Sequence, residues 1–200
     1  MCDWVCNRSV ILGMQTSRML LFTAYILATS SCGSSGKRLE DGSFYPALSV
    51  ISSEMRALDS LPLAVIRYSG KGTETDTSIV EKPDFKTIAE LAFSPDISKP
   101  PLNRLYREEV FLDQTLNRVV LRYGTKEPDA VVSLLEITLD PDSEKVRSMY
   151  IEKQIRRGDT MRTVKSVWTV GRQLQTSVIG RVGDKPLPDL KERFVWGLPQ

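Results

Sequence analysis

The sequence of 200 residues contains no histidine, and none of its three cysteines lies after position 32. The absence of imidazole excludes Ser-His-Asp and Cys-His nucleophiles, His-ligated zinc and histidine acid–base catalysis. Any chemistry would therefore rest on carboxylates, lysine, tyrosine or hydroxyl groups. Because no cysteine follows Cys32, the rest of the chain cannot form a disulfide within itself, and its fold must depend on a hydrophobic core.

The sequence also lacks an excess of charge and a complete ligand motif. Lys and Arg number 27 against 25 Asp and Glu, a balance that predicts no nucleic-acid partner, since such binding rests on clustered basic charge. Ser69–Thr73 lacks the first glycine and the final hydroxyl residue of a phosphate-binding loop. Asp140–Glu144 lacks the glycine and the last glutamate of a calcium loop. We interpret both segments as turns and expect neither a cofactor nor a metal.

The apolar run Met19–Ala28 is too short to be a transmembrane helix. Its ten residues would make about 15 Å of helix, whereas crossing the hydrocarbon core takes about 20 residues. Ten residues suit the apolar segment of a secretory signal, and Arg18 supplies its positive flank. The small residues Thr29-Ser30-Ser31 then lead to Cys32, as expected ahead of a signal peptidase site.

The segment Thr29-Ser30-Ser31-Cys32 resembles the lipobox of bacterial lipoproteins, except that its first residue is threonine where leucine is usual. The resemblance implies that residues 1–31 are a signal peptide and that Cys32 is acylated and becomes the mature N-terminus. Translation is then expected to begin at Met14 or Met19, because the preceding residues are not a basic signal region. Acylation would also explain why the mature chain keeps a single cysteine, at its first residue.

The same resemblance implies a location. It predicts a lipid anchor in the bacterial cell envelope, and Gly33, in place of the aspartate that retains some lipoproteins at the inner membrane, favours the outer membrane facing the periplasm. Two alternatives stay open. Ala28-Thr29-Ser30 fits an ordinary signal peptidase site, which would release a secreted soluble protein, and the apolar run could also remain as a weak uncleaved anchor.

Residues 32–44 are expected to form a flexible Gly/Ser tether, followed by one domain over residues 45–200. Helical periodicity predicts helices over 47–59 and 83–93, and a short helical turn over 102–106. Residues 61–68 fit either a helix or a strand, and residues 69–77 are predicted to be a loop. Two-residue periodicity follows, with strands predicted over 109–113, 118–123, 130–139, 145–156, 161–170, 172–182 and 193–196.

These elements predict an α+β fold, in which two or three N-terminal helices pack on one face of a six- to seven-stranded antiparallel β meander. Tyr150, Trp168 and Trp196 are large aromatic residues of the strand half. They fit either core packing between sheet and helices or a concave face that holds a lipid-like or peptide ligand.

Three functions remain compatible with the sequence. The first is a non-enzymatic binding or scaffolding domain on a lipid anchor, with an envelope protein as partner. The order of helices followed by a meander is also loosely similar to the half-barrel lipoprotein carriers of the periplasm, which implies a lipophilic ligand in a sheet-lined cavity. The third is a carboxylate-based hydrolase, which would need two facing side chains from the set Glu108, Glu109, Asp113, Glu136 and Glu152.

Overall fold

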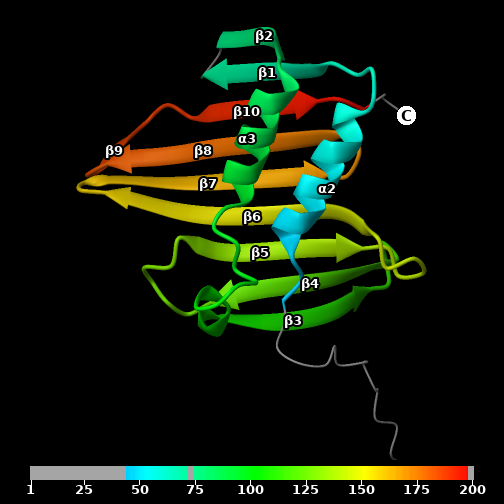
Figure 1. The fold of residues 1–200 in the computed structure, drawn as a ribbon. Coiled ribbons are helices and arrows are strands. Elements are labelled where there is room, and N and C mark those ends of the chain that lie inside the picture. The colour runs from blue at the N-terminus through cyan, green and yellow to red at the C-terminus, as the bar shows by residue number, and fades with distance from the viewer. Residues whose placement is uncertain (1–43, 72–73, 198–200) are drawn as a thin grey trace, which may run out of the picture. The chain divides into compact units, whose positions relative to one another are not determined.

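Two α-helices and a ten-stranded sheet form the part of the chain that the computed structural model describes, residues 44–71 and 74–197 (Figure 1). The helices are α2 (Ala47–Asp59) and α3 (Lys82–Phe93), and a short 3₁₀ helix, η1, covers Leu102–Leu105. The strands are β1 (Val65–Lys71), β2 (Glu74–Val80), β3 (Tyr106–Asp113), β4 (Arg118–Thr125), β5 (Val132–Leu139), β6 (Val146–Arg157), β7 (Thr160–Thr169), β8 (Gln173–Val182), β9 (Lys185–Pro186) and β10 (Leu190–Val195).

The strands are antiparallel throughout and lie in the order β2-β1-β10-β8-β7-β6-β5-β4-β3, with β9 paired to β8. The expected meander is present from β3 to β8, where each strand pairs with the next in sequence. β10 then lies between β8 and β1, so that the hairpin β1–β2 joins the same sheet (Figure 1). The α+β class is confirmed, whereas the strand count of six or seven was too low.

The missing strands come mainly from the segment predicted to be a loop. β1 continues to Lys71 and β2 begins at Glu74, so most of residues 69–77 is strand. Gly and Ser have low strand propensity, but propensity gives way to tertiary pairing. β1 pairs with β2 on one side and with β10 on the other, which fixes its backbone. The same pairing decides the open choice at residues 61–68 for a strand, from Val65 onward.

Local sequence signals predicted one helix and two turns correctly. The helix over 47–59 has the predicted bounds. Gly158 has φ +54° between the paired residues Arg157 and Thr160, the positive φ that a two-residue hairpin turn requires of its first position. At the β5–β6 turn, the Asp140 Oδ1 atom accepts hydrogen bonds from two backbone N–H groups of the turn, at 3.1 and 2.9 Å.

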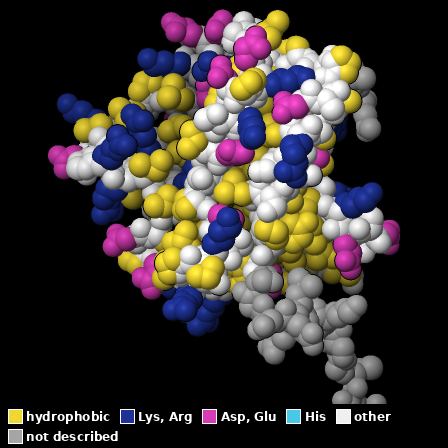
Figure 2. Space-filling model, viewed as in Figure 1, with side chains coloured by type: hydrophobic (Ala, Val, Ile, Leu, Met, Phe, Trp, Pro, Cys, Tyr) yellow, Lys and Arg dark blue, Asp and Glu magenta, His cyan; other side chains and the backbone are white. Residues whose placement is uncertain are grey.

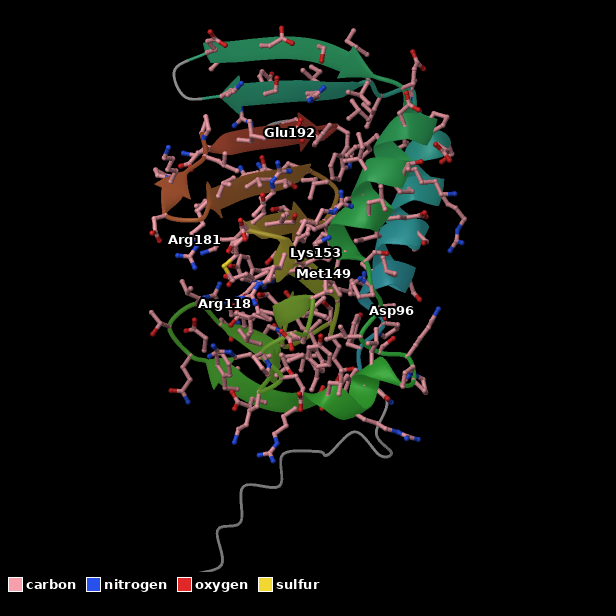
Figure 3. The ribbon with its side chains drawn as sticks, turned by 90° about the vertical axis from the view of Figure 1, so that its left-hand side faces the viewer. Asp96, Arg118, Met149, Lys153, Arg181 and Glu192 are labelled. Atoms are coloured by element: carbon pink, nitrogen blue, oxygen red, sulfur yellow. The ribbon has the colours of Figure 1, made fainter. Side chains whose placement is uncertain are left out.

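The two helices cover one face of the sheet, and the core lies between them. Directly opposed side chains form a buried row across six neighbouring strands: Phe194, Leu174, Trp168, Met149, Ile137 and Leu121. From the helices, Ile51, Met55, Phe85 and Ala89 pack into the same cluster. In Figure 3 the helices lie on one side of the sheet and no helix covers the other. The prediction that the helices pack on one face is confirmed.

Two polar contacts fix the helix layer to the sheet. Lys153 of β6 is only 8% exposed, and its Nζ atom donates to the backbone oxygens of Leu91, at 2.8 Å, and Ser94, at 3.2 Å. These contacts hold the C-terminal end of α3, and burial lowers the pKa of Lys153. Ahead of α2, the Tyr45 backbone N–H donates to the Tyr123 hydroxyl at 3.1 Å.

The signal segment, Cys32 and residues 33–43 of the predicted tether lie outside the described residues. The last residue of that tether, Phe44, is described and packs against Tyr123. Among the helices that are described, none has the length and apolar character needed to cross a membrane.

Candidate functional site

The face of the sheet opposite the helices carries a row of mainly polar side chains. Strand alternation places one side chain from each of seven neighbouring strands directly opposite the next. In order from β1 to β4, the row is Tyr68, Arg193, Gln175, Val167, Tyr150, Glu136 and Arg122. The pattern is the complement of the buried row on the helix side. We call this surface the uncovered face.

A hollow of about 860 Å³ lies over the β1–β10–β8–β7–β6 part of the uncovered face. Two tyrosines, three cations and an amide line it from five strands: Tyr68, Tyr150, Lys165, Lys191, Arg193 and Gln175. Asp189 adds a carboxylate from the loop before β10. Its size is within the roughly 300–1,000 Å³ of small-molecule sites, although those are mostly apolar. The polar lining therefore favours a polar ligand or a polar protein surface.

Tyr150 is held in place by a short network on β6 and β7. Its hydroxyl donates to the Glu152 Oε2 atom at 2.9 Å, and the Lys165 Nζ atom lies 3.5 Å from the same oxygen. Burial raises the pKa of Tyr150 to about 12, and the hydrogen bond to Glu152 adds to this effect. The phenol therefore stays protonated at neutral pH, with its O–H group donated to Glu152.

Arg193 and Tyr68 form a second fixed pair at the β1–β10 side of the hollow. The guanidinium carbon of Arg193 lies 4.7 Å from the centre of the Tyr68 ring, within cation–π distance. The tyrosine ring orients the guanidinium on the uncovered face, where its planar donors suit a carboxylate or phosphate group. β10 thereby contributes the most directional anion-binding group of the hollow.

Two carboxylates of the uncovered face lie beside cations. The Glu136 Oε1 atom lies 3.5 Å from the Arg122 Nε atom, and Glu152 faces Lys165. Glu108 has the parity of the helix side and accepts a hydrogen bond from the Tyr123 hydroxyl at 2.7 Å. Among the described residues, no group of three or more Cys, Asp or Glu side chains is placed to hold a metal ion. The arrangement offers hydrogen bonding and charge recognition.

The three aromatic residues singled out from the sequence are divided between the two faces. Tyr150 lies in the hollow on the uncovered face. Trp168 and Trp196 lie on the helix side, 0% and 6% exposed, with ring centroids 4.8 Å apart. Both rings are close to Phe85 of α3, at 6.2 and 5.1 Å. The structure therefore places the two tryptophans in the core cluster.

Tyr68, Gln175, Lys191 and Arg193 were not recognised as candidates from the sequence. Tyr68 and Arg193 are 125 positions apart and become neighbours only through the β1–β10 pairing. The alternation of polar and apolar residues in β10 was an available signal, but alternation alone does not say which strands adjoin.

Comparison with known proteins gives no relative for this chain: no family model, no curated protein and no solved structure matches it.

Proposed function

We propose that this protein is a lipid-anchored component of the bacterial cell envelope whose domain binds a polar partner through the uncovered face. The observation that carries the proposal is the asymmetry of the sheet. Its helix side is closed by α2 and α3, whereas its other side presents the polar hollow around Tyr68, Tyr150 and Arg193. Side chains that are fixed by neighbours and still accessible are well suited to recognition, because little conformational entropy is lost on binding.

The packing of the interior favours a binding domain over a lipophilic carrier. A carrier needs an apolar cavity of several hundred Å³. Here the space between the sheet and the helices is occupied by an aromatic cluster that includes Phe85, Trp168 and Phe194, each at most 1% exposed. The polar hollow lies on the opposite face, where its lining suits carboxylate, phosphate, amide or hydroxyl groups better than an acyl chain.

The anchor part of the proposal rests on the lipobox-like segment that ends at Cys32. Mass spectrometry of the N-terminal peptide and membrane fractionation, carried out on the full chain in a bacterial host, test it directly. We expect an acylated Cys32 in the membrane fraction. The Cys32→Ala variant should lack the modification and should no longer be found in the membrane fraction. A free Cys32 thiol in the mature protein would contradict the anchor and leave the binding proposal standing.

Site-specific photocrosslinking tests the binding part. A photoreactive phenylalanine analogue at Gln175, which is exposed at the centre of the uncovered face, should give discrete adducts in cells. The matched control is the same analogue at Leu91, which is 63% exposed on α3. Adducts at Gln175 that disappear when Arg193→Ala is added would support recognition through the hollow. Equal adducts at both positions would contradict it.

A further inference from the structure

Strand β3 ends the sheet with an exposed apolar edge. Among the described strands it pairs with β4 alone, so the backbone groups on its outer side have no strand partner. Val110, Phe111 and Leu112 are consecutive in β3, and they are 59%, 45% and 54% exposed. Figure 2 shows hydrophobic side chains at the surface near this edge, mixed with charged ones. The opposite edge, β2, exposes one large hydrophobic side chain, Ile79, among polar residues.

Edge strands of this kind pair readily with another strand. Natural proteins protect edges with charged side chains, lysine above all, and with proline, bulges or short strands. β3 is eight residues long, Tyr-Arg-Glu-Glu-Val-Phe-Leu-Asp, and contains no proline or lysine. Its four charged residues flank the apolar run Val110–Leu112 and do not interrupt it. Its pairing with β4 continues without interruption from Tyr106 to Asp113, so no bulge twists it away. Successive apolar side chains of β3 project to opposite faces of the sheet. Each side chain has a neighbouring strand on one side only, so about half of its surface stays exposed until a further strand is added.

We propose that β3 pairs antiparallel with β3 of a second copy of this chain, with Val110 opposite Val110 across a twofold axis. The two sheets then continue into one. An axis perpendicular to the sheet keeps each face on the same side in both copies, so the helix layers of both lie together and both uncovered faces point the other way.

The charges of β3 select this register. With Val110 on the axis, Arg107 of each copy lies opposite Asp113 of the other, which forms two cross-strand ion pairs, while Glu109 lies opposite Phe111. Arg107 makes no ion pair within the part of the chain that the structure describes, whereas Asp113 already faces Arg118 at 3.1 Å. Asp113 can accept a second cation because a carboxylate has about four lone-pair positions.

Neighbouring registers place like charges together. When the twofold axis is perpendicular to the sheet, directly opposed side chains must lie on the same face. Each residue of β3 therefore lies opposite either the same residue of the other copy or a residue an even number of positions away. With Phe111 on the axis, Glu109 would face Asp113. With Glu109 on the axis, two glutamates would face each other directly. Like charges in opposed positions destabilise a strand pair, so the Val110 register is favoured.

The dimer is compatible with two membrane anchors, a point that rests on the proposed function. The ring of Phe44, the first described residue, packs against Tyr123 of β4, with ring centroids 4.9 Å apart. The two domains therefore begin on the same side of the joint sheet and near the axis. A single strand pair buries less area than the roughly 1,600 Å² of a stable interface. We therefore expect weak association in solution and stronger association when both chains share a membrane surface.

Cysteine crosslinking of the full chain in membranes tests the register. Val110→Cys should form a disulfide-linked dimer under mild oxidation, because opposed residues have Cα atoms about 4.5–5.5 Å apart. Leu112 lies on the same face and is similarly exposed, at 54% against 59% for Val110. Leu112→Cys should crosslink at least about tenfold less, because its mate lies beyond the 7 Å limit for a disulfide. The unsubstituted chain controls for Cys2, Cys6 and Cys32, and peptide mapping locates the bond. Equal crosslinking at positions 110 and 112, or preferential crosslinking of Phe111→Cys, would overturn the proposal.

A charge exchange tests the ion pairs independently. Arg107→Asp and Asp113→Arg should each weaken the dimer by about tenfold, since each replaces two attractive contacts with two repulsive ones. The double variant should restore association, which mere damage to the β3–β4 turn would not do. Failure of the double variant to restore the dimer would refute the register. If β3 variants altered vesicle binding of the chain without altering its oligomeric state, the edge would be a membrane contact and not a dimer interface. Loss of the anchor in Cys32→Ala leaves this test intact in concentrated solution.

Discussion

Replacing Trp168 gives the sharpest test of how the domain is stabilised. The side chain is fully buried at the centre of the aromatic cluster, parallel to Phe85 with an interplanar angle of 9°. Its Nε1 atom is also buried, without a hydrogen-bond partner among the described residues. Two opposing contributions therefore act at one residue: a large apolar surface that favours folding, and an unsatisfied N–H group that opposes it.

The expected losses of folding free energy differ between Trp168→Ala and Trp168→Phe. A buried tryptophan removes about 150–250 Å² from water, worth about 4–6 kcal/mol at 25 cal/mol per Å² as an upper limit. Trp→Ala in cores costs about 3–5 kcal/mol, a large part of the 5–15 kcal/mol stability of a typical domain. Trp168→Phe retains an aromatic ring and removes the unsatisfied N–H group, whose burial costs about 1–3 kcal/mol. We expect Trp168→Phe to cost no more than about 2 kcal/mol.

Urea unfolding followed by far-ultraviolet circular dichroism measures both variants against the wild-type chain. Leu91→Ala, at an exposed position of α3, should change stability by less than about 0.5 kcal/mol and serves as the surface control. If Trp168→Phe were as damaging as Trp168→Ala, the N–H group would have to be satisfied, and the reasoning would fail. A cost below about 1 kcal/mol for Trp168→Ala would remove Trp168 from the core and reopen its role as a ligand-facing residue.

Three further variants test the polar contacts and one turn. Burial lowers the pKa of Lys153 below 10.5 in the folded state. The free energy of unfolding of the wild type should therefore rise relative to that of Lys153→Met as pH increases from the folded pKa to 10.5. Guanidinium unfolding at about pH 7 and about pH 10 checks the sign of this change. Tyr123→Phe loses the hydroxyl that donates to Glu108 and should cost about 1–3 kcal/mol by urea unfolding, with the β3 edge exchanging its amide protons faster. Gly158→Ala should cost about 1–2 kcal/mol by the same assay because φ is positive there, whereas Asp159→Ala, its neighbour, should cost less.

The elements with strong local periodicity could be predicted from the sequence, and those defined by pairing could not. The helix over 47–59 carries apolar side chains at helical spacing, and its bounds were predicted correctly. β1 and β2 contain glycine, serine, threonine and several charges, with no such signal. They are strands because β10 adds their hairpin to the sheet. That pairing joins residues more than a hundred positions apart, and local periodicity has no access to it.

The candidate site shows the same limit. Alternation in β6 correctly separates Tyr150 and Glu152 from Met149 and Ile151, because successive residues of a strand point to opposite faces. Whether an aromatic residue is buried depends on which face the helices cover, and this requires the register between strands. Trp168 lies opposite Met149, and Val167 lies opposite Tyr150. A shift of one position would exchange the two faces.

β10 connects the two proposals. It carries Arg193 and Lys191 to the uncovered face, and it joins the hairpin β1–β2 to the meander, which leaves β2 and β3 as the two ends of the sheet. β2 is polar over most of its length, whereas β3 exposes the uninterrupted apolar run Val110–Leu112. Self-association should therefore extend the sheet at the β3 end, away from the hollow at the β1–β10 end. A dimer built in this way keeps both hollows accessible, so pairing at β3 and recognition at the uncovered face can occur at the same time.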